Sequence, residues 1–388
     1  MNKLLNIVLL QFIVFSAIAN ENKKINSLSK AANAGEEVVY EFDVSNNSAE
    51  AQAFRLMIAT PRELTCEYLL EDSLVSLSPG ETYEGRLKVI VSDQIPIGAY
   101  ESASLLIKSA NEVKRREFVT VRSRQHPFVL VTEETFTETK QKINDHSWAR
   151  ENLDDMLQEL ERFDFPEKKI ISKPRPTKVW SSFNYQASDG EMAFKYSLAW
   201  KLTGEDHYLD KVVEFVKTVC DREEGYLSIG AATSGVQVHE GNFFLFLAAA
   251  CDIIYNEPSF SSEDRENINA TFRYYLAQNR QHMNSLGIMN HQASANAGAL
   301  LVALFLQDIP EIHHLIEADG AWQIKSEKES WQTAGGLSPR QTIVIWWHRD
   351  TLWWRRPLKI MDGTCTTGSF RPNIKARILK MPKAVLLG

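Results

Sequence analysis

The sequence predicts a multidomain β plus α chain, in which a small β-sandwich is followed by a larger helical region. Short runs of alternating apolar and polar residues, separated by turns that contain Gly or Pro, fill residues 25–122. Farther along the chain, apolar residues recur at helical spacing. Because the hydrophobic period changes between these two regions, we expect two domains joined by a linker at Arg122–Pro127.

The first 19 residues have the pattern of a secretory signal peptide. Lys3 supplies a positive charge, Leu4–Ile13 is a short apolar run, and Ala17-Ile18-Ala19 is a cleavage site of small residues. The apolar run is too short to span a bilayer comfortably, and no later run approaches that length. We therefore expect cleavage after Ala19 and a periplasmic or secreted protein without an integral membrane segment.

Charge and cysteine content narrow the class of protein. The net charge is −7, but from Arg340 onward ten Lys/Arg face only two Asp/Glu. A basic end suits nucleic acid or a polyanion, and the predicted export argues against nucleic acid. The four cysteines show neither a disulfide-rich nor a zinc-binding spacing, and Cys220 and Cys251 lie in apolar helical contexts as expected of core thiols. No P-loop, dinucleotide-binding or nucleophile-elbow motif occurs.

Residues 23–122 are predicted to form the β-sandwich module. Ser78-Pro79-Gly80-Glu81 and Pro96-Ile97-Gly98 are turn signals between strands. The clearest predicted strands are Val38–Val44, Phe54–Ile58 and Leu87–Val91. Short strands at this spacing are typical of a sandwich.

The helical region is predicted to consist of helices joined by short turns, with Gly204 and Gly225 just past helix ends. The expected helices are Thr135–Phe163, Glu191–Leu202, Tyr208–Cys220, Asn242–Tyr255, Ser262–Met283 and Ala293–Leu306. Paired helices with broad apolar faces form bundles, solenoids or α/α toroids, and the lack of a fixed repeat weighs against a solenoid.

Residues 337–388 form an atypical basic tail. Trp346, Trp347, Trp353 and Trp354 crowd its first part, and no helical period continues. Trp and Arg clusters can stack on sugars. Since composition, charge and periodicity all change at one point, we interpret the tail instead as the truncated or frame-shifted end of a longer protein, outside the native helical fold.

Four segments together resemble the heparinase II/III and alginate lyase group of polysaccharide lyases, over roughly residues 126–320. They are His126–Thr132, Leu202–Tyr208, His239–Asn242 with Ala250–Tyr255, and Asn290-His291-Gln292. The resemblance implies that residues 126–336 are an incomplete α/α toroid. The sandwich, with Ser45–Ser48 and Leu77–Thr82, resembles the immunoglobulin-like modules of secreted carbohydrate-active proteins.

The resemblance implies β-elimination on an acidic polysaccharide, with Asn290 and His291 as the catalytic pair. Removing the C5 proton of a uronic acid builds negative charge on the carboxylate, so a lyase needs a donor there, a base, and an acid for the leaving oxygen. Asn290 can donate to the carboxylate, and His291 can move a proton. The predicted substrate-binding residues are Gln237, His239, Gln292 and Tyr185. This chemistry requires no metal or organic cofactor.

Two alternatives stay open. The family places a catalytic tyrosine after the Asn-His motif, whereas the last tyrosine here is Tyr275, so the chain is also a candidate for a non-catalytic carbohydrate-binding protein. Tyr185 or Tyr255 could enter the site from elsewhere in the chain.

The second alternative is an α/α-barrel glycoside hydrolase. Its two carboxylates would be Asp189 and Glu191, or Glu240 and Asp252. Acids near helix starts are more often caps. His313-His314 with Glu317 predicts a solvated helix face rather than a metal site.

Overall fold

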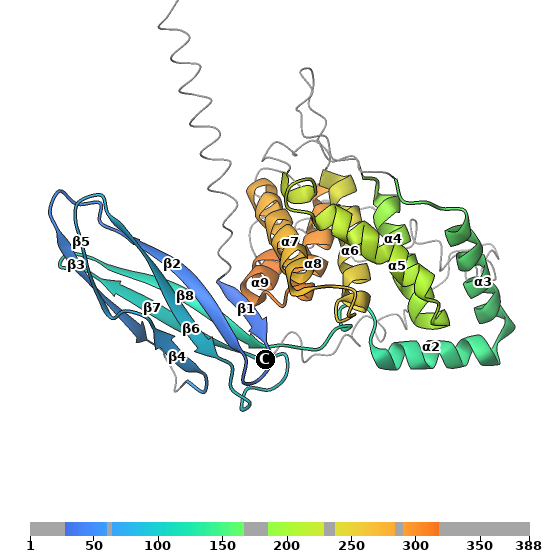
Figure 1. Cartoon of the computed structure of the whole chain (residues 1–388), viewed down its shortest axis with the longest axis horizontal. Coiled ribbons are helices and arrows are strands. Elements are labelled where there is room, and N and C mark those ends of the chain that lie inside the picture. The colour runs from blue at the N-terminus through green and yellow to red at the C-terminus, as the bar shows by residue number, and fades with distance from the viewer. Residues whose placement is uncertain (1–27, 60–63, 167–184, 229–236, 284–289, 318–388) are drawn as a thin grey trace, which may run out of the picture.

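The computed structural model describes residues 28–59, 64–166, 185–228, 237–283 and 290–317. A strand-rich N-terminal region is joined to a helical region by a single linker (Figure 1). This arrangement confirms the β plus α class. The expected signal peptide and the basic tail lie outside the described residues.

The strands form two sheets with one core between them. Their order is β1-β8-β7-β3-β5 in the larger sheet and β2-β6-β4 in the smaller one. The strands are β1 Ser29–Ala32, β2 Glu37–Ser45, β3 Gln52–Ala59, β4 Glu67–Leu70, β5 Leu74–Leu77, β6 Thr82–Ile90, β7 Tyr100–Lys108 and β8 Val113–Arg122. The first of them, β1, pairs in parallel with β8, and the other pairs in both sheets are antiparallel.

The period-two pattern of the sequence explains this region. Tyr40 and Phe42 of β2 point into the core, where they join Leu56 of β3 and Leu105 of β7. Each such side chain contributes on the order of 2 kcal/mol by leaving water. Both predicted turns are present, with Gly80 and Gly98 at φ +80°. A left-handed backbone is a conformation that glycine adopts without strain.

The helices follow the predicted order, but most of their ends differ from the predicted ones. They are α2 Glu133–Asp145, α3 Ser147–Glu161, α4 Ala187–Thr203, α5 Asp206–Cys220, α6 Gln237–Ile254, α7 Ser262–Met283, α8 Asn290–Phe305 and α9 Ile309–Glu317, with a 3₁₀ turn η1 at Tyr226–Ser228. The predicted limits of α7 match the structure, and α6 and α8 begin earlier than expected because polar residues form their first turns.

One predicted helix was wrong. The expected helix Thr135–Phe163 is two helices that meet at His146, whose backbone is extended at φ −131° and ψ 125°. Neither Gly nor Pro marks the break, so the charged sequence concealed it. Gly204 does end α4 as predicted, with φ +79° and its N–H donating to the Trp200 carbonyl oxygen at 2.7 Å.

The helices share a single apolar core, which includes both predicted core thiols. Cys220 and Cys251 are buried and unbridged, and burial raises the pKa of each thiol. Among the described helices, none is both long enough and apolar enough to cross a membrane.

The linker is held to the helical region by its backbone. The Gln307 side chain accepts a hydrogen bond from the Arg124 N–H at 2.7 Å and donates one to the Arg124 carbonyl oxygen at 3.2 Å. Farther back along the chain, Arg273 of α7 donates to the Ser29 carbonyl oxygen of β1 at 3.3 Å. The sandwich therefore contacts the helices through its first strand as well as through the linker.

Candidate functional site

The structure places the predicted catalytic and binding residues on two helix starts. Gln237 and His239 lie in the first turn of α6, and Asn290, His291 and Gln292 lie in the first turn of α8. These positions are fixed by the backbone, and they put five of the six predicted site residues at the beginnings of two helices.

The beginnings of α6 and α8 lie side by side. A Cβ on Gly241 would be 2.5 Å from the Ser294 carbonyl oxygen, and a Cβ on Gly298 would be 2.2 Å from the Gly241 carbonyl oxygen. In addition, Ser294 Oγ donates to Asn242 Oδ1 at 2.6 Å. Contacts this close require glycine on both helices, and they bring the two polar first turns to the same end of the helical region.

The start of α4 reaches the same end. A Cβ on Gly190 would be 2.6 Å from the Phe243 carbonyl oxygen, so the first turns of α4 and α6 are also adjacent. Three helices thus begin together, and the aligned dipoles of helix starts favour negative charge. The first turns of α4 and α6 already hold Asp189 and Glu240. The arrangement suits an anionic ligand.

Tyr185, the sixth predicted site residue, precedes α4 and lies in the apolar core. It is 1% exposed, its ring stacks on Phe243 at 5.4 Å, and it contacts Phe215 edge-on at 5.5 Å. Tyr255 lies at the opposite end of α6, about 24 Å from His239 at 1.5 Å per residue. Of these two tyrosines, only Tyr185 is near the converging helix starts.

Glu240 is the most perturbed acid among the described residues of this end. Its side chain is 5% exposed, and its Oε1 accepts no hydrogen bond within the described part of the chain. Loss of solvent raises the pKa of Glu240 to about 8, so the carboxyl group is largely protonated at neutral pH. A neutral carboxylic acid can both donate and accept a hydrogen bond.

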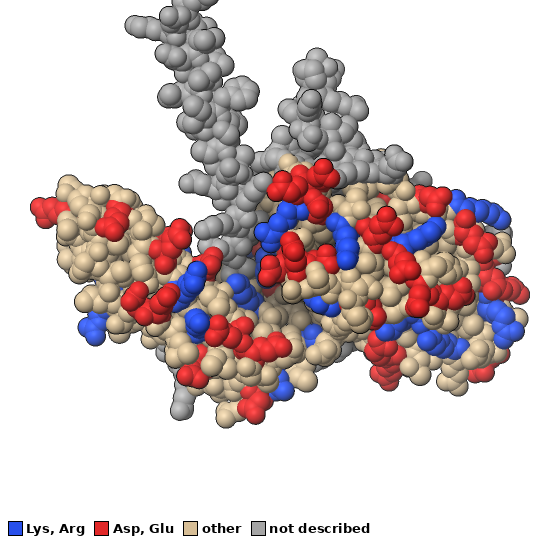
Figure 2. All heavy atoms as spheres, viewed as in Figure 1, with Lys and Arg blue, Asp and Glu red and all other residues tan. Residues whose placement is uncertain are grey.

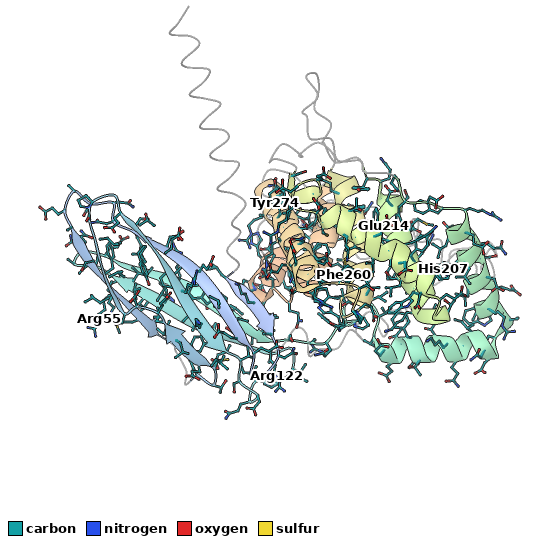
Figure 3. All side chains as sticks on the ribbon, in the orientation of Figure 1. Arg55, Arg122, His207, Glu214, Phe260 and Tyr274 are labelled. Carbon is teal, nitrogen blue, oxygen red and sulfur yellow. The ribbon has the colours of Figure 1, made fainter. Side chains whose placement is uncertain are left out.

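Three buried tyrosines are close enough to Glu240 to interact with its charge. Burial first, and then the charge of Glu240, raises the pKa of Tyr226, Tyr274 and Tyr275. The Tyr275 hydroxyl donates to the Ala295 carbonyl oxygen at 3.1 Å, which ties α7 to the first part of α8. In Figure 3, Tyr274 is labelled at the upper edge of the helical region, and Phe260 is labelled below it.

Sequence reasoning missed this cluster. The sequence suggests Glu240 only as half of a hydrolase pair with Asp252, and it does not link the tyrosines to this acid. The available signal was a single acid in the first turn of an otherwise apolar helix, since Glu240 is the acidic residue in the first turn of α6.

Asp252, at the other end of α6, is bonded to the linker. Its Oδ1 lies 2.7 Å from His126 Nδ1, and its Oδ2 accepts from the Phe128 and Val129 N–H groups at 2.9 and 2.8 Å. The Asn256 side chain donates to the His126 carbonyl oxygen at 2.9 Å. These contacts join the linker to the end of α6, and they give Asp252 a structural role.

The other candidate carboxylates are also engaged. Asp189 accepts from the Gln186 N–H at 2.8 Å as part of a capping box on α4, which confirms the expectation of a cap. Glu191 pairs with Lys195 at 2.9 Å. On α9, His313 lies 3.4 Å from Glu317 on an exposed face, as predicted.

Metal binding has no support in the described ranges. They contain no group of three or more His, Cys, Asp or Glu side chains that could hold a metal ion.

Comparisons with known proteins do not assign a family. No family model matches the chain, and no curated protein matches it. Among solved structures, the Pseudomonas aeruginosa CupB2 chaperone is 16% identical over 26% of this chain and 54% of its own, with a TM-score of 0.20. The periplasmic chaperone SfaE is 12% identical over 29% of this chain and 61% of its own, with a TM-score of 0.21.

A longer alignment reaches the native α-2-macroglobulin of Escherichia coli, from domain MG7 to its C-terminus. It is 10% identical over 76% of this chain and 49% of that chain, with a TM-score of 0.23. The chain therefore spans about half to three fifths of the length of these three structures. Similarity this low carries no argument about function.

Proposed function

We propose that the protein is an exported polysaccharide lyase that cleaves a uronic-acid-containing polysaccharide by β-elimination. The observation that carries the proposal is the convergence of three helix starts, two of which hold Asn290, His291 and His239 in their first turns. An anionic sugar and this end of the helical region are complementary in charge. The resemblance to the heparinase II/III and alginate lyase group supports the same reaction.

The chemistry would use residues of both helix starts. Asn290 donates to the sugar carboxylate and disperses the charge that develops there. His291 or His239 takes the C5 proton, the C4–O bond breaks, and a C4=C5 double bond forms as the leaving oxygen gains a proton. Glu240, protonated near neutral pH and next to His239 in the sequence, can supply a proton to this end of α6. Gln237 and Gln292 are the proposed ligands of sugar hydroxyls.

The proposed fold is an immunoglobulin-like module followed by an incomplete α/α toroid. In a toroid, alternate helices run in the same direction and line the interior. The shared starting end of α4, α6 and α8 supports such an arrangement. The proposed partner is an acidic polysaccharide outside the cytoplasm, after signal cleavage at Ala19.

Ultraviolet absorbance tests the activity. The mature chain is incubated with alginate, a heparan-type glycan and an ulvan-type glycan, and the absorbance of the new unsaturated uronate is followed. Activity on one polymer should fall at least about a hundredfold in Asn290→Ala and His291→Ala. The exposed His207→Ala on α5 is the matched control and should retain full activity. No absorbance change on any uronate polymer would reject the lyase.

A non-catalytic carbohydrate-binding protein is the second candidate. It is favoured by the tyrosines of the cluster, because burial raises the pKa of Tyr226 and Tyr275 well above 10 and makes them reluctant to give up a proton. This candidate predicts retention on a polyanionic glycan without any unsaturated product. Retention that survives combined Asn290→Ala and His291→Ala substitution would favour it over the lyase.

A glycoside hydrolase receives less support. Asp252 is saturated with hydrogen bonds and Asp189 caps a helix, so each proposed carboxylate pair has one member that is committed to the fold. Release of reducing sugar without a double bond would identify a hydrolase.

A further inference from the structure

A cleft of about 800 Å³ lies between the sandwich and the helical region. Its walls come from β1 and β2, from the linker, and from α7 with the ends of α6 and α8. In Figure 2, Lys and Arg side chains are visible beside Asp and Glu side chains where the two regions meet. Clefts between domains are common places for ligands, and this one is large enough for a sugar.

One wall carries a lysine without an ion-pair partner. Lys30 of β1 is half-buried, its Nζ donates to the Val39 carbonyl oxygen at 2.5 Å, and it lies 5.6 Å from the centre of the Tyr40 ring. Within the described residues no carboxylate pairs with this ammonium group. Burial and then the charge of Arg273 lower the pKa of Lys30, and the charge of Glu41 has a smaller, opposing effect.

The facing wall carries a second cation. Arg273 of α7 is largely buried, and its guanidinium pairs with Asp308 at 3.1 Å. Asp308 neutralises one of these two charges. Glu36, Glu41, Glu223 and Glu266 also line the cleft, but Arg273 acts on Lys30 more strongly than Glu41 does, so positive charge prevails around Lys30. Two like charges at reduced solvent exposure repel each other, and an oxyanion between them would relieve that repulsion.

We propose that this cleft binds an anionic sugar residue, whose carboxylate or sulfate group contacts Lys30 and Arg273. A cleft of this size is far larger than an inorganic anion needs, and its walls also hold polar groups for hydroxyls. Asn269 donates to the Tyr255 hydroxyl at 3.0 Å, which leaves its amide oxygen to accept from a sugar. The site does not depend on lyase chemistry, because none of the residues at the starts of α6 and α8 line it.

Nuclear magnetic resonance of ¹³C-dimethylated lysines in the full chain tests the site. Lys30→Gln assigns the Lys30 signal, and the chain is titrated with D-glucuronate, glucose and sodium sulfate. Glucuronate should shift the Lys30 signal saturably and raise the pKa of Lys30, whereas glucose should not. Sulfate should bind more weakly than glucuronate, because it lacks the hydroxyls.

Variants separate this site from general charge attraction and from the proposed lyase site. Isothermal titration calorimetry measures glucuronate binding in variants that lack the Lys30 signal. Lys30→Gln should weaken glucuronate binding about tenfold or more, the expected loss of a charge-assisted hydrogen bond, while Lys30→Arg should retain it. The exposed Lys88→Gln on β6 is the matched control and should bind normally. Asn290→Ala with His291→Ala should leave the Lys30 response unchanged even if lyase activity is lost. Absence of a saturable Lys30 shift, equal binding by Lys30→Gln, or sulfate binding as tight as glucuronate would overturn the proposal.

Discussion

The two ends of α6 each bury a carboxylate, but they treat it in opposite ways. Asp252, near the C-terminal end, is 1% exposed and receives hydrogen bonds from the His126 ring and from two backbone N–H groups. Glu240, in the first turn, is 5% exposed, and its Oε1 receives none within the described part of the chain. Twelve positions on one helix therefore separate a buried acid with several hydrogen bonds, Asp252, from a buried acid whose Oε1 has none, Glu240.

This difference separates a structural acid from a candidate functional one. Burial of an ionised carboxylate is costly unless hydrogen bonds replace the lost water. At Asp252 the linker supplies that replacement, so the acid stabilises the junction between the domains. At Glu240 the protein instead raises the pKa to about 8, which leaves a proton available near neutral pH.

Removal of Asp252, the hydrogen-bonded acid, should have the largest effect on stability. Asp252→Ala leaves the His126 ring and two partly buried N–H groups without their acceptor and should lower the free energy of unfolding by about 4 kcal/mol. Urea denaturation measures the loss, and Asp210→Ala, at an exposed position of α5, is the control. A change below about 1 kcal/mol would show that Asp252 does not hold the linker.

Replacement of Glu240 should instead raise the free energy of unfolding, by an amount that depends on pH. Glu240 has a folded pKa of about 8 against 4.5 for the free acid, so the native state keeps a proton that the unfolded chain loses. Burial of Glu240 therefore lowers the free energy of unfolding little below pH 4.5. The loss grows as pH rises from 4.5 to about 8 and is complete above pH 8.

Glu240→Gln removes that dependence, and it should stabilise the chain on the order of 3 kcal/mol at pH 9 and little at pH 4.5. Unfolding at several pH values measures the difference between variant and parent. Glu214→Gln, an exposed acid on α5 labelled in Figure 3, is the control. A difference that does not change with pH would contradict the raised pKa.

The close contact between the starts of α6 and α8 can be tested by whether Gly298→Ala stabilises or destabilises the protein. Helix propensity alone predicts that Gly298→Ala stabilises α8 by about 1 kcal/mol. The added Cβ would instead meet the Gly241 carbonyl oxygen at 2.2 Å, so we expect a loss of about 2 kcal/mol as α6 and α8 separate. Thermal unfolding distinguishes the two outcomes, and any stabilisation would show that the helices do not touch there.

The smallest effect is expected at the edge of the Asp252 network. Asn256 is exposed and donates one hydrogen bond to the His126 carbonyl oxygen. Asn256→Ala should cost about 1 kcal/mol, since water can replace part of that bond. A loss as large as that of Asp252→Ala would mean that the peripheral bond matters as much as the buried ones.

Local sequence patterns predicted most of the individual elements. Alternation predicted the central strands, and the expected helix Ser262–Met283 has the bounds of α7. Ser261, just before it, accepts through its Oγ from the Asp264 N–H at 3.1 Å. The break at His146 was missed because no residue with a special backbone preference stands there. Regular elements depend on short-range periodicity, and such patterns can be read along the chain.

The candidate site depended on contacts that sequence order does not contain. The Asn-His motif drew attention to the start of α8, but its proximity to α6 follows from Gly241 and Gly298, which show no pattern of their own. Similarly, nothing near Asp252 in the sequence reveals that residues 126–129 will bond to it. Whether a buried acid has hydrogen-bond partners depends on residues that are distant along the chain. For this reason Asp252 and Glu240 look alike in the sequence.

The parallel pairing of β1 with β8 has a mechanical consequence. Ser29 lies opposite Val119 and Ala32 opposite Arg122, so the sandwich begins and ends on neighbouring strands that point the same way. A pull between the chain before β1 and the linker after β8 would act in opposite directions along these two strands. Their hydrogen bonds would be loaded together in shear and would not open one by one. The sandwich should therefore resist extension along this direction as a stiff link in series with the helical region.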